Sequence, residues 1–291
     1  MAGMDEYIQK AKTLIEALPY IRKFTGKTIV VKYGGAAMID EGRMASFAED
    51  IVLLQHVGIH PVVVHGGGPQ IDRMLERLNI STERKEGLRV TSPAAMEVVE
   101  MVLGGTVNKQ ITSYINRIGG KAVGICGKDG GLIRARKMQA KSRATGEAID
   151  LGLVGEVVRV APEILKTLKA DGFVPIIAPI GVGEEGEAYN INGDTAAAEV
   201  AAAVDAEKFI LLTDVSGVLD GAGGRISTMT EESASEAINT GKITGGMIPK
   251  VKCGLTALRK GVRKVHIIDG RIPHSVLLEV FTDAGVGTEI A

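Results

Sequence analysis

The stretch HPVVVHGGGPQID, residues 60–72, joins an apolar run to three glycines, a proline and the start of a helix. A continuous β-branched run of this kind suits a parallel strand that is buried on both faces. Glycines between a strand and a helix let a ligand, often a phosphate, approach the backbone, and the helix N-terminus favours an anion. This stretch therefore predicts a strand, loop and helix unit with a ligand site at its loop.

Apolar runs of the same type recur along the chain, each followed by glycine or polar residues and then by a segment with helical periodicity. The expected strands lie at 28–33, 60–65, 121–126, 173–180, 208–215 and 264–269, and the expected helices at 40–57, 69–79, 93–118, 161–171, 194–204 and 247–260. This alternation predicts an α/β fold with a doubly wound, mostly parallel central sheet and two lobes. Ligands of such sheets bind beyond the carboxyl ends of the strands. Residues 183–194 indicate a loop or hairpin near the lobe boundary.

The composition is that of an ordinary globular protein without a strong charge bias. The chain has 34 Lys and Arg against 35 Asp and Glu, and 45% of its residues are hydrophobic. Nucleic acid and membrane surfaces are therefore poor partners, and no apolar stretch is long enough to cross a bilayer. Cys126 and Cys253 form no CxxC pair, no histidine motif indicates a metal, and the N-terminus lacks a secretory signal. We expect a cytoplasmic protein with no metal held by its side chains.

The glycine loop does not match the dinucleotide fingerprint. After Gly66 and Gly68, the third glycine position of that pattern holds Ile71. Gly66, Gly67 and Gly68 can still direct backbone N–H groups at an anion. A tight turn before Pro69 would explain the proline, but it does not require three glycines.

Two lysines stand out by their position. Lys32 closes an apolar strand and is followed by Gly34 and Gly35, while Lys250 lies at the start of a helix. Most lysines are solvated surface charges, but ammonium groups at the ligand edge of a sheet can stabilise a transferring phosphoryl group. Asp194 precedes an apolar helix, so it is either the N-cap of that helix or a carboxylate that holds the two lysines in place.

Other polar residues have two interpretations each. Arg89 stands among small and apolar neighbours, which suits a bidentate clamp on a substrate carboxylate, although a surface or interdomain salt bridge fits as well. Asn190 is either a turn residue or an amide donor to a ligand. Near the N-terminus, apolar residues from Tyr7 to Leu18 share one helix face, and Pro19 interrupts the pattern. This helix either docks on its own domain or forms an arm between subunits.

Six segments together resemble the amino acid kinase family, and within it the arginine-sensitive enzymes that phosphorylate N-acetyl-L-glutamate. They are IVVKYGG, VVVHGGGPQI, GLRVT, NINGDTAA, LLTDVSGVL and GGMIPKV, and they follow the family's order and approximate spacing from about residue 28 onward. The resemblance implies the amino acid kinase fold and ATP-dependent phosphorylation of the side-chain carboxylate of N-acetyl-L-glutamate in arginine biosynthesis. It also implies that Mg²⁺ enters with the nucleotide.

The resemblance assigns roles to the residues already singled out. It implies that Lys32 and Lys250 stabilise the transition state and that Asp194 organises them. The residues expected to hold acetylglutamate are Gly66, Gly67, Gly68, Arg89 and Asn190. Those expected to contact the nucleotide are Gly34, Gly35, Thr213, Asp214, Gly217, Gly245, Gly246 and Met247. A carboxylate acceptor is already ionised, so this chemistry needs no general base.

In arginine-sensitive members, an extra N-terminal helix joins three dimers into a hexamer, and arginine binds where this helix meets the C-terminal lobe. Residues 274–290 resemble the tail that lines the arginine pocket, which implies feedback inhibition and contacts from Tyr20, Glu279, Gly285 and Gly287. We therefore expect a homohexamer, with a nitrogen-signalling protein as an open further partner. The expected division is an oligomerisation helix at 1–25, an acetylglutamate-binding and dimerisation lobe at 26–193 and an ATP-binding lobe at 194–291.

Two rival functions remain open. A neighbouring kinase of the family could act on aspartate, glutamate, carbamate or a nucleoside monophosphate, although GLRVT and YNING favour acetylglutamate. A catalytically dead arginine sensor would keep the fold and act as a binding protein. The presence of Lys32, Lys250 and Asp194 argues against a dead sensor.

Overall fold

The computed structural model describes residues 3–38, 41–142, 145–220, 223–283 and 285–291. The largest sheet contains β1 (Thr28–Tyr33), β2 (His60–His65), β5 (Ala122–Cys126), β10 (Val174–Ala178), β13 (Lys208–Thr213), β14 (Thr228–Met229), β15 (Val265–Asp269) and β16 (Thr288–Ile290). A smaller sheet contains β6 (Ile133–Lys137), β9 (Gly155–Val160), β11 (Ile180–Val182) and β12 (Ala188–Asn190). Two short hairpins are formed by β3 (Arg84–Lys85) with β4 (Leu88–Arg89) and by β7 (Ala140–Lys141) with β8 (Ala148–Ile149).

The α-helices are α1 (Met4–Phe24), α2 (Glu41–His56), α3 (Gly68–Arg77), α4 (Pro93–Glu100), α5 (Asn108–Arg117), α6 (Glu163–Ala170), α7 (Gly193–Ala203), α8 (Glu231–Asn239), α9 (Met247–Arg259) and α10 (Ser275–Phe281). Short 3₁₀ segments are η1 (Gly35–Met38) and η3 (Asp129–Gly131), and a π-helical segment, η2 (Met101–Val107), joins α4 to α5. All six strands and all six helices expected from the sequence are present. Position 40, at the start of one expected helix, lies outside the described residues.

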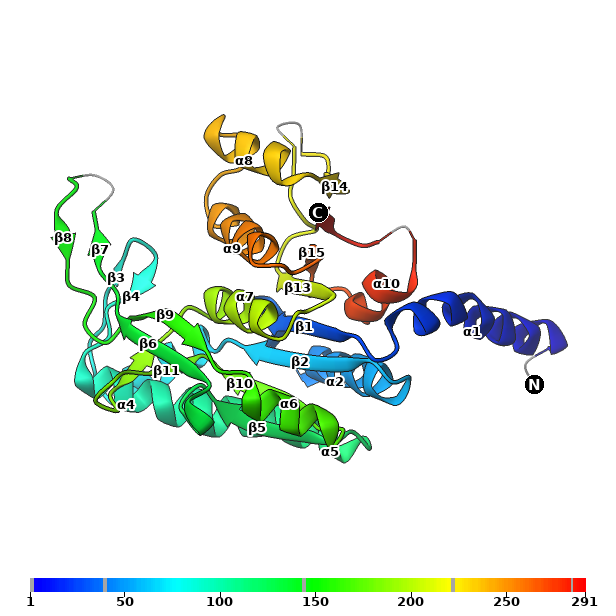
Figure 1. Ribbon diagram of the computed structural model, residues 1–291, viewed down its shortest axis with the longest axis horizontal. Helices are drawn as coiled ribbons and strands as arrows, with labels where there is room; N and C mark the ends of the chain where they lie inside the picture. Colours follow the sequence, from blue (N-terminus) through cyan, green and yellow to red (C-terminus); the bar gives the residue numbers. More distant parts are fainter. Residues whose placement is uncertain (1–2, 39–40, 143–144, 221–222, 284) are drawn as a thin grey trace.

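The strand order of the large sheet confirms the doubly wound topology. The order is β14-β16-β15-β13-β1-β2-β10-β5, and each neighbouring pair is parallel except β15 with β16. The central strand β1 pairs with β2 on one side and with β13 on the other (Figure 1). Strand order reverses at β1, so the ligand crevice is expected at the carboxyl ends of β1, β2 and β13.

The strands are buried on both faces because helices cover both faces. Alternate residues of β1 enter two different apolar layers. Val31 belongs to the layer that includes residues of α2, α3, α4, α5 and α10, and Val30 belongs to the layer that includes residues of α6, α7, α8 and α9. All six residues of β1 and of β13 are buried. This double coverage explains why the strands read as continuous apolar runs without polar alternation.

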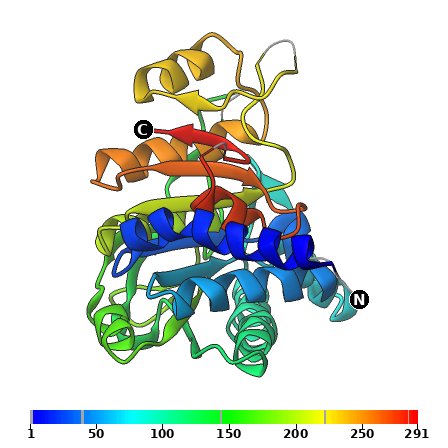
Figure 2. The ribbon, with the colours of Figure 1, turned by 90° about the vertical axis from the view of Figure 1, so that its right-hand side faces the viewer.

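Helix α1 departs from the rest of the fold, and it projects along the outside of the molecule (Figures 1 and 2). Leu14 and Ile15 expose 74% and 68% of their surface, and only the last turn is anchored, by buried Phe24 and partly buried Tyr20. The alternative in which the apolar face docks on its own domain is therefore wrong.

Among the described residues, no helix is long and apolar enough to cross a membrane.

Pro19 does not end α1, contrary to the break expected from the sequence. The helix continues for one more turn to Phe24. A proline removes one backbone donor and leaves the carbonyl four residues earlier without its helical partner. Ile15 lies on the exposed part of the helix, where water can satisfy its carbonyl, and the packing of Phe24 holds the following turn in place.

The glycine loop connects β2 to α3, as predicted, and a residue of η2 also packs against it. The loop or hairpin expected over 183–194 is confirmed: residues 183–187 connect β11 to its antiparallel partner β12, and the chain then continues into α7. The single helix expected over 93–118 is interrupted by η2, which brings Leu103 against the loop. A Cβ atom on Gly67 would lie 2.5 Å from Leu103 Cδ2. The middle glycine is therefore explained by this close contact.

Candidate active site

Asp194 joins the two lysines singled out from the sequence. Its Oδ1 lies 2.9 Å from Lys32 Nζ, and its Oδ2 lies 3.0 Å from Lys250 Nζ. Lys32 comes from the carboxyl half of β1, Asp194 from the first turn of α7 and Lys250 from the first turn of α9. Three distant segments thus meet at the carboxyl edge of the sheet, and the cluster carries a net charge of one positive unit.

Asp194 is available for the lysines because a different residue caps α7. The side chain of Asn192 accepts hydrogen bonds from the N–H groups of Asp194 at 3.0 Å and Thr195 at 3.1 Å, so Asn192 is the N-cap. The N-cap alternative for Asp194 is therefore wrong. Side-chain capping satisfies the first helical donors, and the Asp194 carboxylate is left to bind the two ammonium groups.

The charge state of Asp194 results from two opposing effects. Burial alone would raise its pKa, but the positive charges of Lys32 and Lys250 outweigh burial and hold the pKa below its ordinary value. The carboxylate therefore stays ionised. An ionised, doubly paired carboxylate cannot act as a general acid near neutral pH, so its contribution is to position the two ammonium groups.

The glycine loop is held beside Lys32 by buried hydrogen bonds. Gly66 N–H donates to the Tyr33 carbonyl at 2.7 Å, which ties the loop to the end of β1. His65 Nδ1 donates to the Gly66 carbonyl at 2.8 Å, and His65 Nε2 accepts from the Asn108 amide at 3.2 Å. Burial lowers the pKa of His65 to about 4, so the imidazole is neutral and fits this pattern. His65 thus fixes the loop, a role that sequence reasoning missed.

A cavity of about 200 Å³ opens beside this loop and collects all five residues expected at the acceptor site. Its lining includes Gly66, Gly67, Gly68, Arg89 and Asn190, together with Leu103 of η2 and Arg84 of the β3–β4 hairpin. Arg89 is buried, and the Asn190 amide donates to Thr91 Oγ1 at 3.2 Å. Backbone donors, an amide and a guanidinium therefore surround one small space, which suits an anionic acceptor.

The residues expected to contact a nucleotide lie directly after β1, at or directly after the end of β13, and at the start of α9. The ends of β1 and β13 lie side by side, since Lys32 pairs with Leu211, and this places Gly34 near Thr213 and Asp214. Gly246 is the N-cap of α9 and Met247 is its first residue, one turn before Lys250. The individual contacts of these residues with a nucleotide stay predictions.

Several of these glycines have a local structural reason. A Cβ atom on Gly34 would lie 2.7 Å from Lys32 Nζ, so glycine leaves room for the ammonium group. Gly35 and Gly245 have positive φ angles of 63° and 56°, which favour glycine. A Cβ atom on Gly217 would lie 2.7 Å from Thr288 Oγ1, so packing against β16 already explains that glycine.

A second polar cavity, of about 290 Å³, lies where α1 meets the C-terminal segment. Tyr20, Glu279, Gly285 and Gly287 all line it. Its other charged lining residues, which the sequence analysis did not identify, are Lys23, Lys208, Lys264, Asp283 and Glu289. Gly287 also has a packing role, because a Cβ atom there would lie 2.1 Å from the Ile267 carbonyl oxygen.

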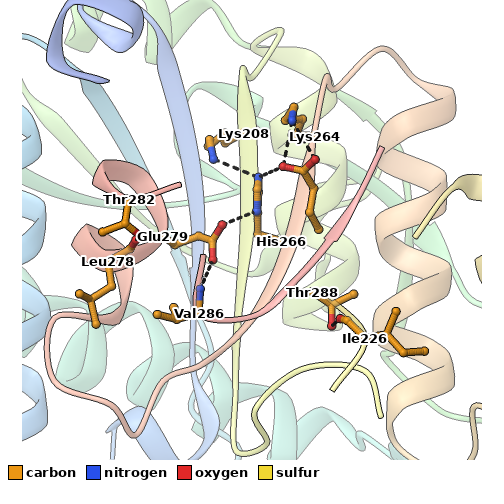
Figure 3. Close-up of polar contacts among 10 residues, drawn as sticks. Lys208, Ile226, Lys264, His266, Leu278, Glu279, Thr282, Val286 and Thr288 are labelled. Atoms are coloured by element: carbon orange, nitrogen blue, oxygen red, sulfur yellow. Dashed lines mark hydrogen bonds and ion pairs between the residues drawn. The ribbon is translucent and has the colours of Figure 1, made fainter. Parts of the chain in front are cut away.

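Figure 3 shows a chain of charged and polar groups in which Lys208 and Glu279, both lining residues of this cavity, are linked through His266. Lys208 Nζ lies 3.2 Å from His266 Nε2, and His266 Nδ1 lies 2.7 Å from Glu279 Oε1. Burial lowers the pKa of both Lys208 and His266. Burial would raise the pKa of Glu279, but the hydrogen bond and charge of His266, the Val286 N–H and the charge of Lys208 together outweigh burial and hold the pKa below its ordinary value. Lys208 in β13 and His266 in β15 are polar residues within otherwise apolar strands, and this pattern could have identified the cluster from the sequence.

The comparisons with known proteins agree with this architecture. The sequence profile described as "Amino acid kinase family" matches residues 27–269. The acetylglutamate kinase of Syntrophobacter fumaroxidans is 58% identical over 288 residues, which cover 97% of this chain and 96% of that protein. The acetylglutamate kinase of Geobacter sulfurreducens is 56% identical over 290 residues, or 99% of both chains.

A solved structure resembles the chain over nearly its whole length. N-acetylglutamate synthase from Neisseria gonorrhoeae, complexed with coenzyme A and N-acetyl-glutamate, has a TM-score of 0.85 at 27% sequence identity. That match covers 97% of this chain and 63% of the synthase chain, so this chain spans less than two thirds of the synthase.

Replacing Asp194 by Asn should destabilise the fold at pH 7, because two poorly solvated ammonium groups then face each other without a carboxylate. Removing one partner of a buried ion pair costs about 3–5 kcal/mol, and partial solvent access places the expected loss near about 2–3 kcal/mol. Urea unfolding of the wild type and the variant measures it.

The same substitution has a defined pH dependence. The folded-state pKa of Asp194 is lowered, so its stabilisation is complete above the ordinary pKa of about 3.9 and is lost as pH falls through the folded-state value. The difference between wild type and variant should therefore shrink in acid. Asp171→Asn, at the exposed end of α6, is the control and should change stability by less than about 0.5 kcal/mol. Equal unfolding free energies for Asp194→Asn and the wild type at pH 7 would contradict the bridging role.

Proposed function

The chain belongs to the amino acid kinase family, and from this premise we propose that it transfers the γ-phosphoryl group of MgATP to the side-chain carboxylate of N-acetyl-L-glutamate. The product is N-acetylglutamyl 5-phosphate, and the proposed setting is arginine biosynthesis in the cytoplasm. The observation that carries the proposal is the Asp194 carboxylate between Lys32 and Lys250, beside the acceptor cavity. The names of full-length relatives at 54–58% identity support the same substrate.

The acceptor cavity offers a matching set of groups for a dicarboxylate with an amide. In the proposed complex, Arg89 binds the α-carboxylate and Asn190 donates its amide to the substrate. The N–H groups of Gly67 and Gly68 are the proposed donors to the side-chain carboxylate and to the phosphoryl group that arrives on it. The N–H of Gly66 already donates to the Tyr33 carbonyl, so the proposed contribution of Gly66 is to let the substrate approach the backbone closely. With the α-carboxylate bound at Arg89 and the side-chain carboxylate at the glycine loop, the reacting carboxylate points toward Lys32. The Cε atom of Lys32 lies near the glycine loop and α7.

The two lysines supply the proposed catalysis by charge. An ionised carboxylate is the nucleophile, so no side chain has to remove a proton. Lys32 and Lys250 stabilise the negative charge on the transferring group and on the leaving oxygen, and Asp194 keeps both ammonium groups in position without taking part in proton transfer. Alignment and electrostatic stabilisation are the contributions of this chain.

The nucleotide is proposed to bind on the α9 side of the lysines. Gly34, Gly35, Thr213, Asp214, Gly217, Gly245, Gly246 and Met247 are the proposed contacts, and the turns they form suit close approach of phosphates. Mg²⁺ would enter with those phosphates, since this ion keeps most of its waters and binds through substrate phosphates. The acceptor lobe is then 26–193 and the nucleotide lobe 194–291, with β1 and β13 at their junction.

We also propose that the cavity between α1 and the C-terminal segment binds arginine and thereby inhibits the enzyme. It offers carboxylates from Glu279, Glu289 and Asp283 to a guanidinium group, and lysines such as Lys208 to a carboxylate. N-acetylglutamate synthase from Neisseria gonorrhoeae has been solved with coenzyme A and L-arginine, at 26% identity and a TM-score of 0.82 over 97% of this chain and 65% of that chain. Tyr20 links the cavity to α1, since it forms a hydrogen bond with Asp283.

The exposed apolar face of α1 supports a proposed trimer of dimers. Tyr7, Ile8, Leu14, Ile15 and Leu18 each expose more than 40% of their surface. An amphipathic helix that leaves its apolar face in water needs a covering surface, and a second copy of α1 is self-complementary in a symmetric oligomer. Residues 1–25 are therefore proposed to be the oligomerisation helix.

The acceptor can be identified by comparing candidate substrates. ADP release in a coupled assay with MgATP should depend on N-acetyl-L-glutamate and should be much slower with aspartate, glutamate, carbamate or a nucleoside monophosphate. The reason is that only acetylglutamate fills both the carboxylate and the amide positions of the cavity. Preference for another acceptor would reassign the substrate, and no turnover with any acceptor would favour a sensor that has lost catalysis.

Lys32→Ala and Lys250→Ala should each lower kcat by roughly 100-fold or more while changing the KM for acetylglutamate far less. Each substitution removes a charge that acts mainly on the transition state. Steady-state kinetics measure both constants, and Lys252→Ala on the exposed side of α9 is the matched control, with expected activity near wild type. A raised KM with unchanged kcat in the two lysine variants would sink the proposed catalytic role.

Deletion of residues 1–24 should leave active dimers that arginine inhibits poorly, because the deletion removes both α1 and Tyr20. Light scattering coupled to size-exclusion chromatography gives the oligomeric state, and activity against arginine concentration gives the inhibition. Intact hexamers after the deletion, or unchanged inhibition, would refute the role of α1.

A further inference from the structure

Asp72, the fifth residue of α3, connects this helix to both strands of the β3–β4 hairpin. Its Oδ1 lies 2.5 Å from Arg89 Nη2, and its Oδ2 lies 3.2 Å from Arg84 Nη2. Arg84 and Arg89 are register partners in the hairpin, so one carboxylate binds the arginine of each strand. The hairpin forms one wall of the acceptor cavity, with Arg84, Gly87, Leu88 and Arg89 in its lining. Asp72 therefore fixes that wall against α3.

The two ends of the Arg89 guanidinium are used differently. Nη2 donates to Asp72 and, at 3.3 Å, to the carbonyl of Gly68. Nη1 is buried and has no hydrogen-bond partner among the described residues. Leaving a buried charged donor unpaired costs free energy. This edge of the guanidinium can therefore bind an oxygen atom of a ligand that enters the cavity.

We propose that Asp72 is a positioning residue for the substrate: it holds Arg89 by Nη2 so that the Nη1 edge presents itself to the substrate carboxylate. The inference rests on the proposed function, in which Arg89 binds the α-carboxylate of the acceptor. Asp72 itself touches neither the substrate nor the reacting atoms. Its effect is exerted on acceptor affinity through the orientation of Arg89 and of the hairpin wall.

A competing effect of Asp72 would have the opposite sign. Its negative charge could weaken the attraction of an incoming carboxylate, so that its removal would tighten acceptor binding. The Asp72 side chain is 47% exposed, and water screens a charge at such a site, whereas the side chain of Arg89 is only 5% exposed. The directional bond to a buried guanidinium therefore outweighs the screened charge, and loss of orientation decides the outcome.

Kinetics of Asp72→Ala and Asp72→Asn test the inference. Asp72→Ala removes the acceptor of the Arg89 hydrogen bond, and it should raise the KM for acetylglutamate about tenfold, the scale of one charge-assisted hydrogen bond. Asp72→Asn keeps an oxygen in the same place and should raise KM less. In both variants kcat should stay within about threefold and the KM for ATP should not change. Glu76→Gln, an exposed carboxylate one turn along α3, is the matched control and should match the wild type.

An unchanged KM for acetylglutamate in Asp72→Ala would overturn the inference, and so would a lowered KM or a loss confined to kcat. A merely structural role would lower the melting temperature and raise the KM values for both substrates together, which is also contrary to the proposal. The coupled assay of the wild type with several candidate substrates tests the proposed function independently of Asp72. If another carboxylate proves to be the acceptor, the ratio of variant to wild-type KM is measured with that substrate. If none turns over, calorimetric titration with acetylglutamate must show weaker binding to Asp72→Ala than to the wild type, and equal binding overturns the inference.

Discussion

The arrangement of the site depends on one interaction, the Asp194 carboxylate between the ammonium groups of Lys32 and Lys250. Two positive charges at this separation repel each other, and each loses hydration by partial burial, so neither would hold its position alone. The carboxylate neutralises one of them and leaves one positive unit for an anionic reaction centre. Because the three residues come from β1, α7 and α9, the bridge also ties the two predicted lobes together at the ligand edge of the sheet.

Hydrogen bonds made by neighbouring residues leave the Asp194 carboxylate free to bind the two lysines. Asn192 caps α7 and so releases Asp194 from that role, while neutral His65 and Asn108 hold the glycine loop from below. Gly34 lacks the side chain that would collide with the Lys32 ammonium group. The hydrogen bonds of Asn192, His65 and Asn108 are made within the protein, and this favours a preorganised charged centre.

The acceptor cavity and the C-terminal cavity follow the same physical pattern at two ends of the molecule. In each, a buried basic side chain lines a small polar space. Arg89 binds the Asp72 carboxylate in one cavity, and Lys208 contacts His266, which in turn contacts Glu279, in the other. A buried charge with one partner and one free direction is suited to a ligand of opposite charge. Each cavity is lined in part by a peripheral element, the β3–β4 hairpin in one and α1 in the other.

The sequence alone determined the sheet, its strands and the helices that cover both faces, because continuous apolar runs and helical periodicity are local properties. It also marked Lys32, Lys250, Asp194 and Arg89, since each stands at a strand or helix end where apolar neighbours make a charge conspicuous. It could not decide whether Asp194 was an N-cap, whether α1 docked on its own domain, or that Asp72 and His65 support the site. Those outcomes depend on contacts between residues far apart in the chain, and only the packed tertiary structure sets the distances and burial that decide which hydrogen bonds and ion pairs form.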